Sequence, residues 1–288
     1  MQELDEKQIE VLLKGISIPT QPKIVLDLMD LFKLPDPDSG KIVKLISADV
    51  ALSAKMLKLA NSPLFRASTK VDSINHALMR LGSKNFYNLV LVSSLQSTFK
   101  TRKEDQVLID ALWDHSLKIA KVCELIANES HELKGLAPPD LAYMTGLFHD
   151  CSIPLMLGKF DDYRDVFFLV LNNAMSIEME DKQFSTNHAL ASYLMAKTWY
   201  LPVPVCRAIL SHHDSVYEQK NGEVADKKLW AILGFAESLT PMKEEECFHR
   251  QEIIDDEWIF RHGTIIDELY LSEERMERLT AAIDRLVA

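Results

Sequence analysis

Apolar residues recur along most of this chain at the three- and four-residue intervals that mark one face of a helix. Between Asp49 and Asn61, for example, such a stripe includes Leu52 and Met56. Alternating strand patterns are nearly absent, and the neighbours of the one strand-like run, Phe167 to Leu171, favour a helix. The pattern predicts an all-α fold.

Start and stop signals support this interpretation. Ser73 can cap a short helix that Gly82 ends, and Ser83 can cap the helix that follows. In LANSPLF, Asn61 is expected to cap a helix end and Pro63 to stop the helix, although a partner-binding role for this motif is an alternative.

A polar break separates two helical parts of the chain. The run FKTRKEDQ, residues 99–106, interrupts the apolar pattern and is a candidate hinge. Further helices are predicted at 110–128, 141–150, 160–175, 187–200, 203–213 and 227–239, with a last one from about Ser272. The acidic stretch from Lys243 to Asp256 is expected to be a loop or an exposed helix. The expected division is 1–100, an N-terminal helical part; 107–240, a second helical half; and 241–288, a C-terminal helical extension.

Composition narrows the classes of partner. With 47% hydrophobic residues among 288, the chain can bury a substantial core. Its formal charge of −11 disfavours nucleic acid and anionic lipid as ligands. No apolar run approaches the roughly 18 residues that suggest a membrane span, and the charged start MQELDEKQIE is unlike a signal peptide. Four scattered cysteines without a CxxC pair fit a reducing compartment. We therefore expect a cytoplasmic protein.

The candidate chemistry lies in the histidines. His115 shares a helix face with Ile119 and Val122, and His149 with Asp150 ends a helix whose inner face is made of small residues. His188 opens the next candidate helix, and His212 and His213 close the one after it. A single inward-facing histidine is usually a hydrogen-bonded core residue. Several in register on separate helices are typical of a metal cluster in a bundle.

Nitrogen and carboxylate donors of this kind suit one or two Fe, Mn, Ni or Zn ions. An ion held there can lower the pKa of a bound water and make it a nucleophile. The remaining histidines, His76, His131, His249 and His262, lie in polar contexts typical of the surface.

The order His, His-Asp, His, His-His resembles the HD superfamily of metal-dependent phosphohydrolases. Several segments are similar to the HDOD family, the HD-related output domain of bacterial signalling proteins. They are IPTQPKIVLDLMDL, LISADVALSAKMLKLANSPLF, VDSINHALMRLG, GLFHD, and NHALASYLMAKTW through LPVPVCRAILSHHD. The resemblance covers residues 10–240 and leaves the C-terminal residues unexplained.

The resemblance implies an all-α, HD-domain-like bundle with an N-terminal helical subdomain. It also implies a family regarded as regulatory, which often lacks the full catalytic set. Carried over position by position, the metal ligands of the related HD-GYP phosphodiesterases fall on His115, His149, Asp150, His188, His212, His213 and Glu237, the last in place of an aspartate.

Two departures disfavour cyclic-dinucleotide hydrolysis. The active enzymes carry an HD-x-G-K run whose lysine contacts the scissile phosphate, whereas HDCSIP places Ile153 there. An apolar side chain cannot neutralise a phosphoryl oxygen. The GYP signature expected after the paired histidines is also replaced, by HHDSVYEQKNGE.

Three hypotheses follow. The first is an output module that has no catalytic residues and acts through signalling protein partners. Whether it forms a homodimer is left open. The second is a metal-dependent phosphohydrolase of unknown substrate, in which His149 and Asp150 would carry the chemistry. The third is a structural scaffold whose histidines remain from an ancestral site and satisfy one another by hydrogen bonds.

Overall fold

The computed structural model describes a chain built almost entirely of α-helices. It covers residues 16–32, 34, 37–65, 70–99, 102–129, 131–171, 176–214, 223–240, 243–244, 247–248 and 262–287. Within these ranges the only strands are β1 (Lys243–Glu244) and β2 (Cys247–Phe248), which pair antiparallel. The all-α prediction is confirmed. The first part of the acidic stretch is thus a short ladder where a loop or helix was expected, and the rest of that stretch lies outside the described residues.

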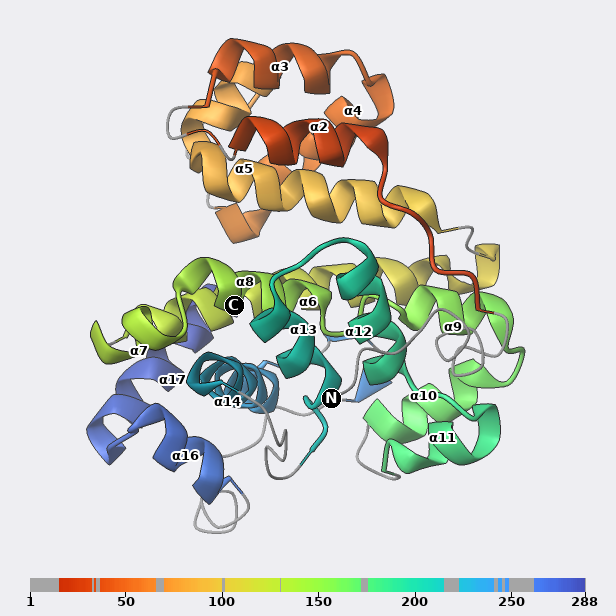
Figure 1. Ribbon diagram of the computed structural model, residues 1–288, viewed down its shortest axis with the longest axis vertical. Coiled ribbons are helices and arrows are strands. Elements are labelled where there is room, and N and C mark those ends of the chain that lie inside the picture. Colours follow the sequence, from red (N-terminus) through yellow and green to blue (C-terminus); the bar gives the residue numbers. More distant parts are fainter. Residues whose placement is uncertain are drawn as a thin grey trace. The chain divides into compact units, whose positions relative to one another are not determined.

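The chain forms two compact units, residues 19–100 and residues 1–18 with 101–288. In the first unit, α5 is contacted by α2, α3 and α4 (Figure 1). The elements of this unit are α2 (Lys23–Phe32), α3 (Ser39–Ser47), α4 (Val50–Ala60), the 3-10 turn η1 (Pro63–Phe65) and α5 (Ile74–Thr98). The three-part division expected from the sequence stays a prediction.

Side-chain caps and one glycine set the helix ends of this unit. The Asp49 carboxylate accepts from the amide of Leu52 at the start of α4, and the Ser73 hydroxyl accepts from that of His76 at the start of α5. Gly82 interrupts α5 with φ 73° and ψ 159°, a conformation that favours glycine. The predicted cap at Ser73 and break at Gly82 are both present.

Asn61 has a structural function at the end of α4. Its side-chain amide donates to the carbonyls of Leu57 and Val71 at 2.7 and 2.8 Å, and its oxygen accepts from the amide of Val71 at 2.8 Å. Asn61 therefore joins the end of α4 to the segment that leads into α5. These hydrogen bonds explain its presence in LANSPLF without a binding partner.

The second unit contains the histidines. Its α-helices are α6 (Gln106–Ala127), α7 (His131–Leu136), α8 (Pro139–Phe148), α9 (Ile153–Lys159), α10 (Tyr163–Leu171), α11 (Glu178–Phe184), α12 (His188–Thr198), α13 (Val203–Leu210), α14 (Val224–Leu239), α16 (Gly263–Leu269) and α17 (Glu273–Val287), and a 3-10 turn η2 (Lys103–Asp105) precedes α6. The polar run expected to be a hinge falls between α5 and α6, and Lys100 and Thr101 lie outside the described residues.

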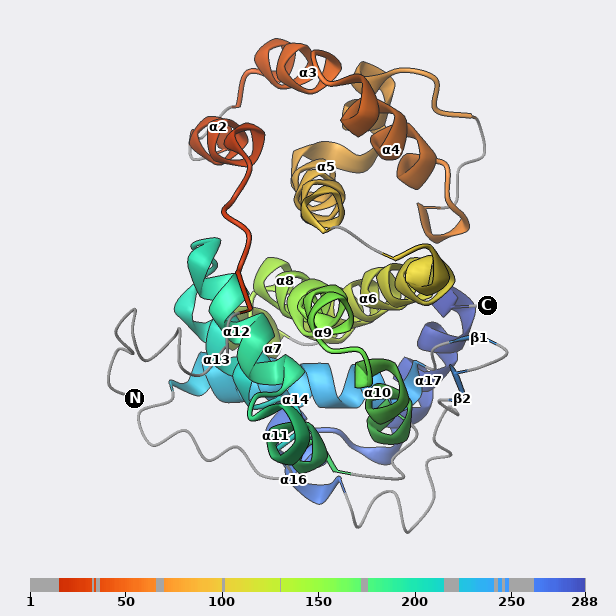
Figure 2. The same ribbon diagram turned by 90° about the vertical axis from the view of Figure 1, so that its right-hand side faces the viewer.

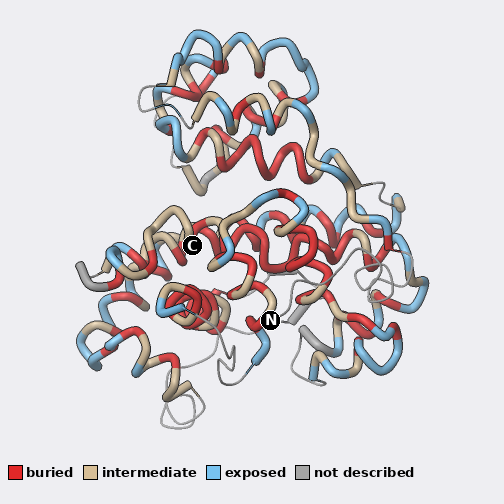
Figure 3. Tube along the Cα trace, viewed as in Figure 1, coloured by how far each residue is buried: buried red, intermediate tan, exposed pale blue. Residues whose placement is uncertain are grey.

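The core of this unit is formed around α6, α8 and α14. α8 packs along α6, and α14 lies against α6, α8 and α13 (Figure 2). Figure 3 shows α14 buried along most of its length. On α6 the predicted inner stripe is buried, with Ile119, Val122 and Ile126 fully covered. Among the described residues, no helix combines the length and the apolar character needed to cross a bilayer.

Gly146 allows α6 and α8 to approach closely. A Cβ atom on Gly146 would lie 2.8 Å from the Cα and 2.9 Å from the amide nitrogen of Ala120. Main-chain atoms cannot move aside as a flexible side chain can. The small face of α8 seen in the sequence therefore lets this helix pack closely on α6.

A buried lysine attaches α16 to α14. Lys228 is 3% exposed, and its ammonium donates to the main-chain carbonyl of Glu268 and lies 3.1 Å from the carboxylate of the same residue. The ammonium also lies 4.1 Å from the ring centroid of Tyr270. These contacts with a carbonyl, a carboxylate and an aromatic ring offset the cost of removing the ammonium from water.

We expect Gly146→Ala to lower the free energy of unfolding by about 1–3 kcal/mol, because the added methyl group overpacks a helix contact formed by main-chain atoms. Chemical denaturation measures the change. Gly135→Ala on α7 is the matched control, since a Cβ there meets nothing within 4 Å. The prediction is wrong if both variants have the stability of the wild type.

Candidate metal centre

The predicted ligands come together from five helices of one unit. His115 lies on α6 and Glu237 on α14, while His188 is the first residue of α12. His149 is the C-cap of α8, with Asp150 next to it, and His212 and His213 follow the last turn of α13. The sequence placed the His-Asp and His-His pairs inside helices; they lie just beyond the helix ends.

This displacement has a physical consequence, because the last carbonyls of a helix have no partner within the helix. The Nδ1 atom of His149 lies 2.7 Å from the carbonyl oxygen of Gly146, and that of His212 lies 2.7 Å from the carbonyl oxygen of Ile209. Each Nδ1 must carry the proton to donate to a carbonyl. In both rings Nε2 is therefore the atom left to face the interior.

These Nε2 atoms gather around the carboxylate of Asp150. Nε2 of His149 lies 3.1 Å from Oδ2, and Nε2 of His188 and of His212 lie 3.5 and 3.6 Å from Oδ1. Oε1 of Glu237 lies 3.3 Å from Nε2 of His149. The rings of His149, His188 and His212 and the Asp150 carboxylate are all buried.

Three of the atoms that face inward, Nε2 of His149, Nε2 of His212 and Oδ1 of Asp150, are buried and form no well-aligned hydrogen bond among the described residues, although they lie close to one another. Buried polar atoms normally form good hydrogen bonds, so three such atoms at one point need an explanation. Two ligand atoms bound about 2.0–2.1 Å from one ion are about 3–3.5 Å apart, close to the separations found here. The residues present fit a divalent ion with nitrogen and oxygen donors.

His115 and His213 lie beside different histidines of this group. The ring centroid of His115 lies 6.0 Å from that of His149. Nε2 of His213 lies 2.8 Å from Nε2 of His188, and its ring lies 4.1 Å from that of His212. His188, His212 and His213 also form a set whose potential ligand atoms all lie within 4.8 Å of one another. All seven predicted residues thus lie in one cluster, and which of them bind an ion stays a prediction.

The charges of the cluster compensate one another. Burial opposes the charged form of His149, but Asp150 and Glu237 outweigh burial and raise its pKa to about 9. Burial opposes the charge on His188 as well, and Glu180 and Asp150 raise its pKa to about 9. Burial would raise the pKa of Asp150, yet His149 and the other imidazoles hold it well below its usual range. Without a metal, both imidazoles therefore carry a second proton near neutral pH.

Glu180 is the residue that sequence reasoning missed. Its carboxylate lies 2.8 Å from Nδ1 of His188, and its side chain is fully buried on α11. In the sequence it is one acid within IEMEDK, and the helix that carries it has only seven residues. A short acidic helix gives no periodic signal that separates a buried glutamate from its solvated neighbours.

Comparisons with known proteins show the family and the fold. The family described as HDOD domain matches residues 18–215. Cyclic di-GMP phosphodiesterase CdgJ of Vibrio cholerae is 31% identical over 126 residues, which are 42% of this chain and 26% of that protein. The crystal structure of an HDOD domain protein with unknown function from Geobacter sulfurreducens is 25% identical, with a TM-score of 0.66 over 96% of this chain and 99% of that one.

A solved structure from Marinobacter aquaeolei, described as that of a signal transduction protein, has a TM-score of 0.71 at 19% identity. The matched region covers the whole of this chain and 64% of the Marinobacter chain. At 19% identity this likeness supports the fold alone. The chain spans 26–50% of the length of the curated relatives it matches.

Metal affinity should rise with pH from about 6 to about 9, because a metal must displace the protons of His149 and His188. Since both pKa values lie near 9, deprotonation favours metal binding over this whole range. Titration of the metal-free protein with Mn²⁺ at several pH values measures the effect, and about two protons should be released per ion near pH 7.

His76→Ala should leave this pH dependence unchanged, because His76 is a partly exposed histidine near the start of α5 that pairs with Asp72 and belongs to the unit of residues 19–100, not to the unit that contains the cluster. An affinity for Mn²⁺ that stays constant from about pH 6 to about pH 9 contradicts the assignment of His149 and His188 as ligands.

Proposed function

The chain belongs to the HDOD domain family, and from that premise we propose that it is a signal-transduction output module that holds a divalent metal without hydrolysing a phosphate ester. The proposed ligands are His149, Asp150, His188, His212 and Glu237, with His115 and His213 available to a second ion. A bound ion would supply Lewis acidity at this point. The protein residues orient the donors and exclude water from the buried side of the cluster.

The observation that carries the non-catalytic part of the proposal is Ile153. It is the first residue of α9, directly after the Asp150 turn, and its side chain is completely buried. Among the described residues, no lysine or arginine forms an ion pair with Asp150 or Glu237. Phosphoryl transfer depends on cations placed where charge develops, so a metal alone leaves transition-state charge poorly compensated.

A metal-dependent phosphohydrolase is the second candidate, favoured by the clustering of all seven residues. The named activity of CdgJ does not decide between the two, because the matched segment is 26% of that protein. In this alternative, His149 and Asp150 would carry the chemistry.

Hydrolysis decides between the two candidates. Protein loaded with Mn, Fe, Ni or Zn should show no more turnover of p-nitrophenyl phosphate, bis(p-nitrophenyl) phosphate or cyclic di-GMP than the His149→Ala variant. Turnover by the wild type that His149→Ala abolishes, with the melting temperature of the chelated protein unchanged, would establish the phosphohydrolase instead.

Chelation separates a metal-binding module from a vestigial cluster. Removal of the ion with a chelator should lower the melting temperature. If the ion was present at 100 times its dissociation constant, the free energy of unfolding should fall by about 2.7 kcal/mol. Re-addition of the ion should restore it, and Asp150→Asn should not respond. A wild type that is indifferent to chelator supports the vestigial hypothesis.

The proposed partners are signalling proteins, and nucleic acid and membrane surfaces are disfavoured by the net charge of −11. Among the described residues of the unit 19–100, four large apolar side chains are exposed, and Val50 at 81% and Met79 at 70% are the most exposed of them. Exposed apolar residues contribute to protein interfaces when a partner covers them. We expect Val50→Glu or Met79→Glu to reduce the capture of a partner at unchanged melting temperature. Equal capture by the wild type and both variants contradicts this location.

A further inference from the structure

Glu180 is a buried carboxylate that accepts hydrogen bonds on three sides. The main-chain amide of His188 donates to Oε2 at 2.8 Å. The Nδ1 atom of the same residue lies 2.8 Å from Oε1 and 2.9 Å from Oε2. The hydroxyl of Tyr163 donates to Oε1 at 3.2 Å. Both Glu180 and Tyr163 are 0% exposed, so this carboxylate depends on these donors for its solvation.

The position of His188 explains why it needs a side chain as its anchor. His149 and His212 follow helices and use main-chain carbonyls three residues back. His188 instead begins α12, and no earlier turn of that helix exists to offer a carbonyl. A carboxylate from α11 takes that place. It also lies near the positive end of α12, where an anion is favoured.

Capping of α12 does not account for Glu180. Asn187 is already the N-cap, and its side chain accepts from the amide of Leu190 at 2.8 Å. The contact between Glu180 and the imidazole is additional to that cap. It leaves Nε2 of His188 directed at Oδ1 of Asp150 and Nε2 of His213, at 3.5 and 2.8 Å.

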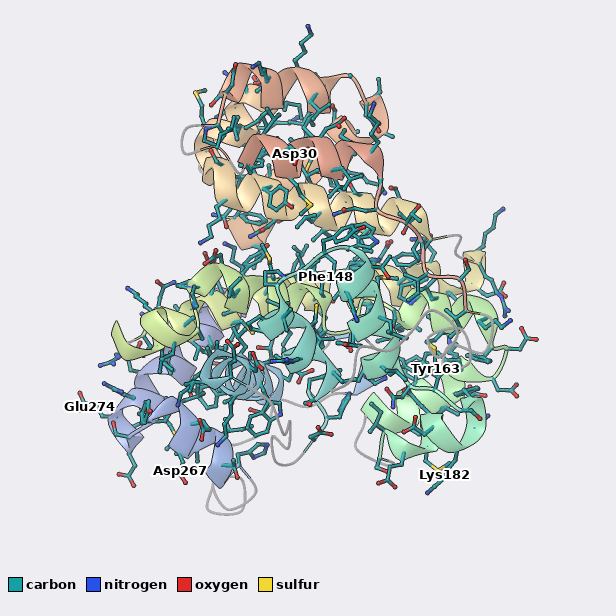
Figure 4. The ribbon with its side chains drawn as sticks, viewed as in Figure 1. Asp30, Phe148, Tyr163, Lys182, Asp267 and Glu274 are labelled. Carbon is teal, nitrogen blue, oxygen red and sulfur yellow. The ribbon has the colours of Figure 1, made fainter. Side chains whose placement is uncertain are left out.

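We propose that Glu180 is a positioning residue that fixes the ring of His188 with Nε2 toward the metal, and that Tyr163 holds the carboxylate in place. The metal part of this inference rests on the proposed function, whereas the orientation of the ring does not. Figure 4 labels Tyr163 on α10 and Lys182 on α11. These two helices are in contact, and both are linked to His188 through the carboxylate of Glu180.

The test begins with Glu180→Gln and titration of the full chain with Zn²⁺ in competition with a chromophoric chelator. An amide keeps the shape of the carboxylate but not its negative charge, and it replaces one of the two accepting oxygens with an NH₂ group that cannot accept. Zinc affinity should fall about 10–100-fold, as is usual when the orienting partner of a ligand histidine is lost. Glu178→Gln is the matched control on the same helix, because Glu178 has a side chain that is 72% exposed.

A double-mutant cycle separates orientation of His188 from a general structural effect. If Glu180 acts through His188, then Glu180→Gln should cost no further zinc affinity in a His188→Ala background. Additive losses in the double variant overturn the proposal. Tyr163→Phe keeps the ring and removes only the hydroxyl, so it should cause a smaller loss and provides a test should Glu180→Gln fail to fold.

Ring ¹⁵N shifts of His188 in the metal-free protein, at a pH of about 10, test the orientation without any metal. The wild type should carry its proton on Nδ1, and Glu180→Gln or Tyr163→Phe should shift the population toward the Nε2–H tautomer. If the wild type binds no zinc, the proposed function fails while this measurement still decides the role of Glu180. Unchanged tautomer populations together with wild-type zinc affinity overturn the inference.

Discussion

The buried carboxylate of Asp150 is the constraint on which the rest of this site depends. An isolated charge in the interior of a helical bundle is strongly unfavourable, and it persists only where opposite charges or a metal surround it. The rings of His149, His188 and His212 meet this requirement from three different helix ends. In the metal-free protein, the raised pKa values of His149 and His188 supply two positive charges. A divalent ion that displaces two protons leaves the net charge of the cluster unchanged, so the same packing can tolerate both states.

The direction of each ring follows from where its residue stands relative to a helix. A helix ends with free carbonyls and begins with free amides. A histidine just after a helix therefore finds an acceptor for Nδ1 in the main chain, as His149 and His212 do. A histidine at the start of a helix does not, and His188 requires Glu180. The local chemistry of helix termini thus specifies both the arrangement of the cluster and the one place where a second side chain is needed.

Much of the fold could be predicted from the sequence because helix periodicity and caps are local signals. The stripe of α6 and the cap at Ser73 are of this kind. Six of the seven site residues were singled out by their places on separate helices and then by resemblance to a family, whereas Glu237 came from the resemblance alone; the structure places all seven in one cluster. What the sequence could not supply was the tertiary detail. Glu180 looks like its solvated neighbours, and nothing local indicates that the ring of His115 meets His149 edge-on, 6.0 Å away between centroids.

Gly146 joins two properties that are independent in most helix pairs. Its missing Cβ sets how closely α8 approaches Ala120 on α6, and its carbonyl is the acceptor that orients His149. A force that slides or separates these helices therefore acts directly on one imidazole of the cluster, through a single peptide unit. A variant that changes the packing of α8 on α6 at this point would therefore also move the acceptor that sets the direction of the His149 ring.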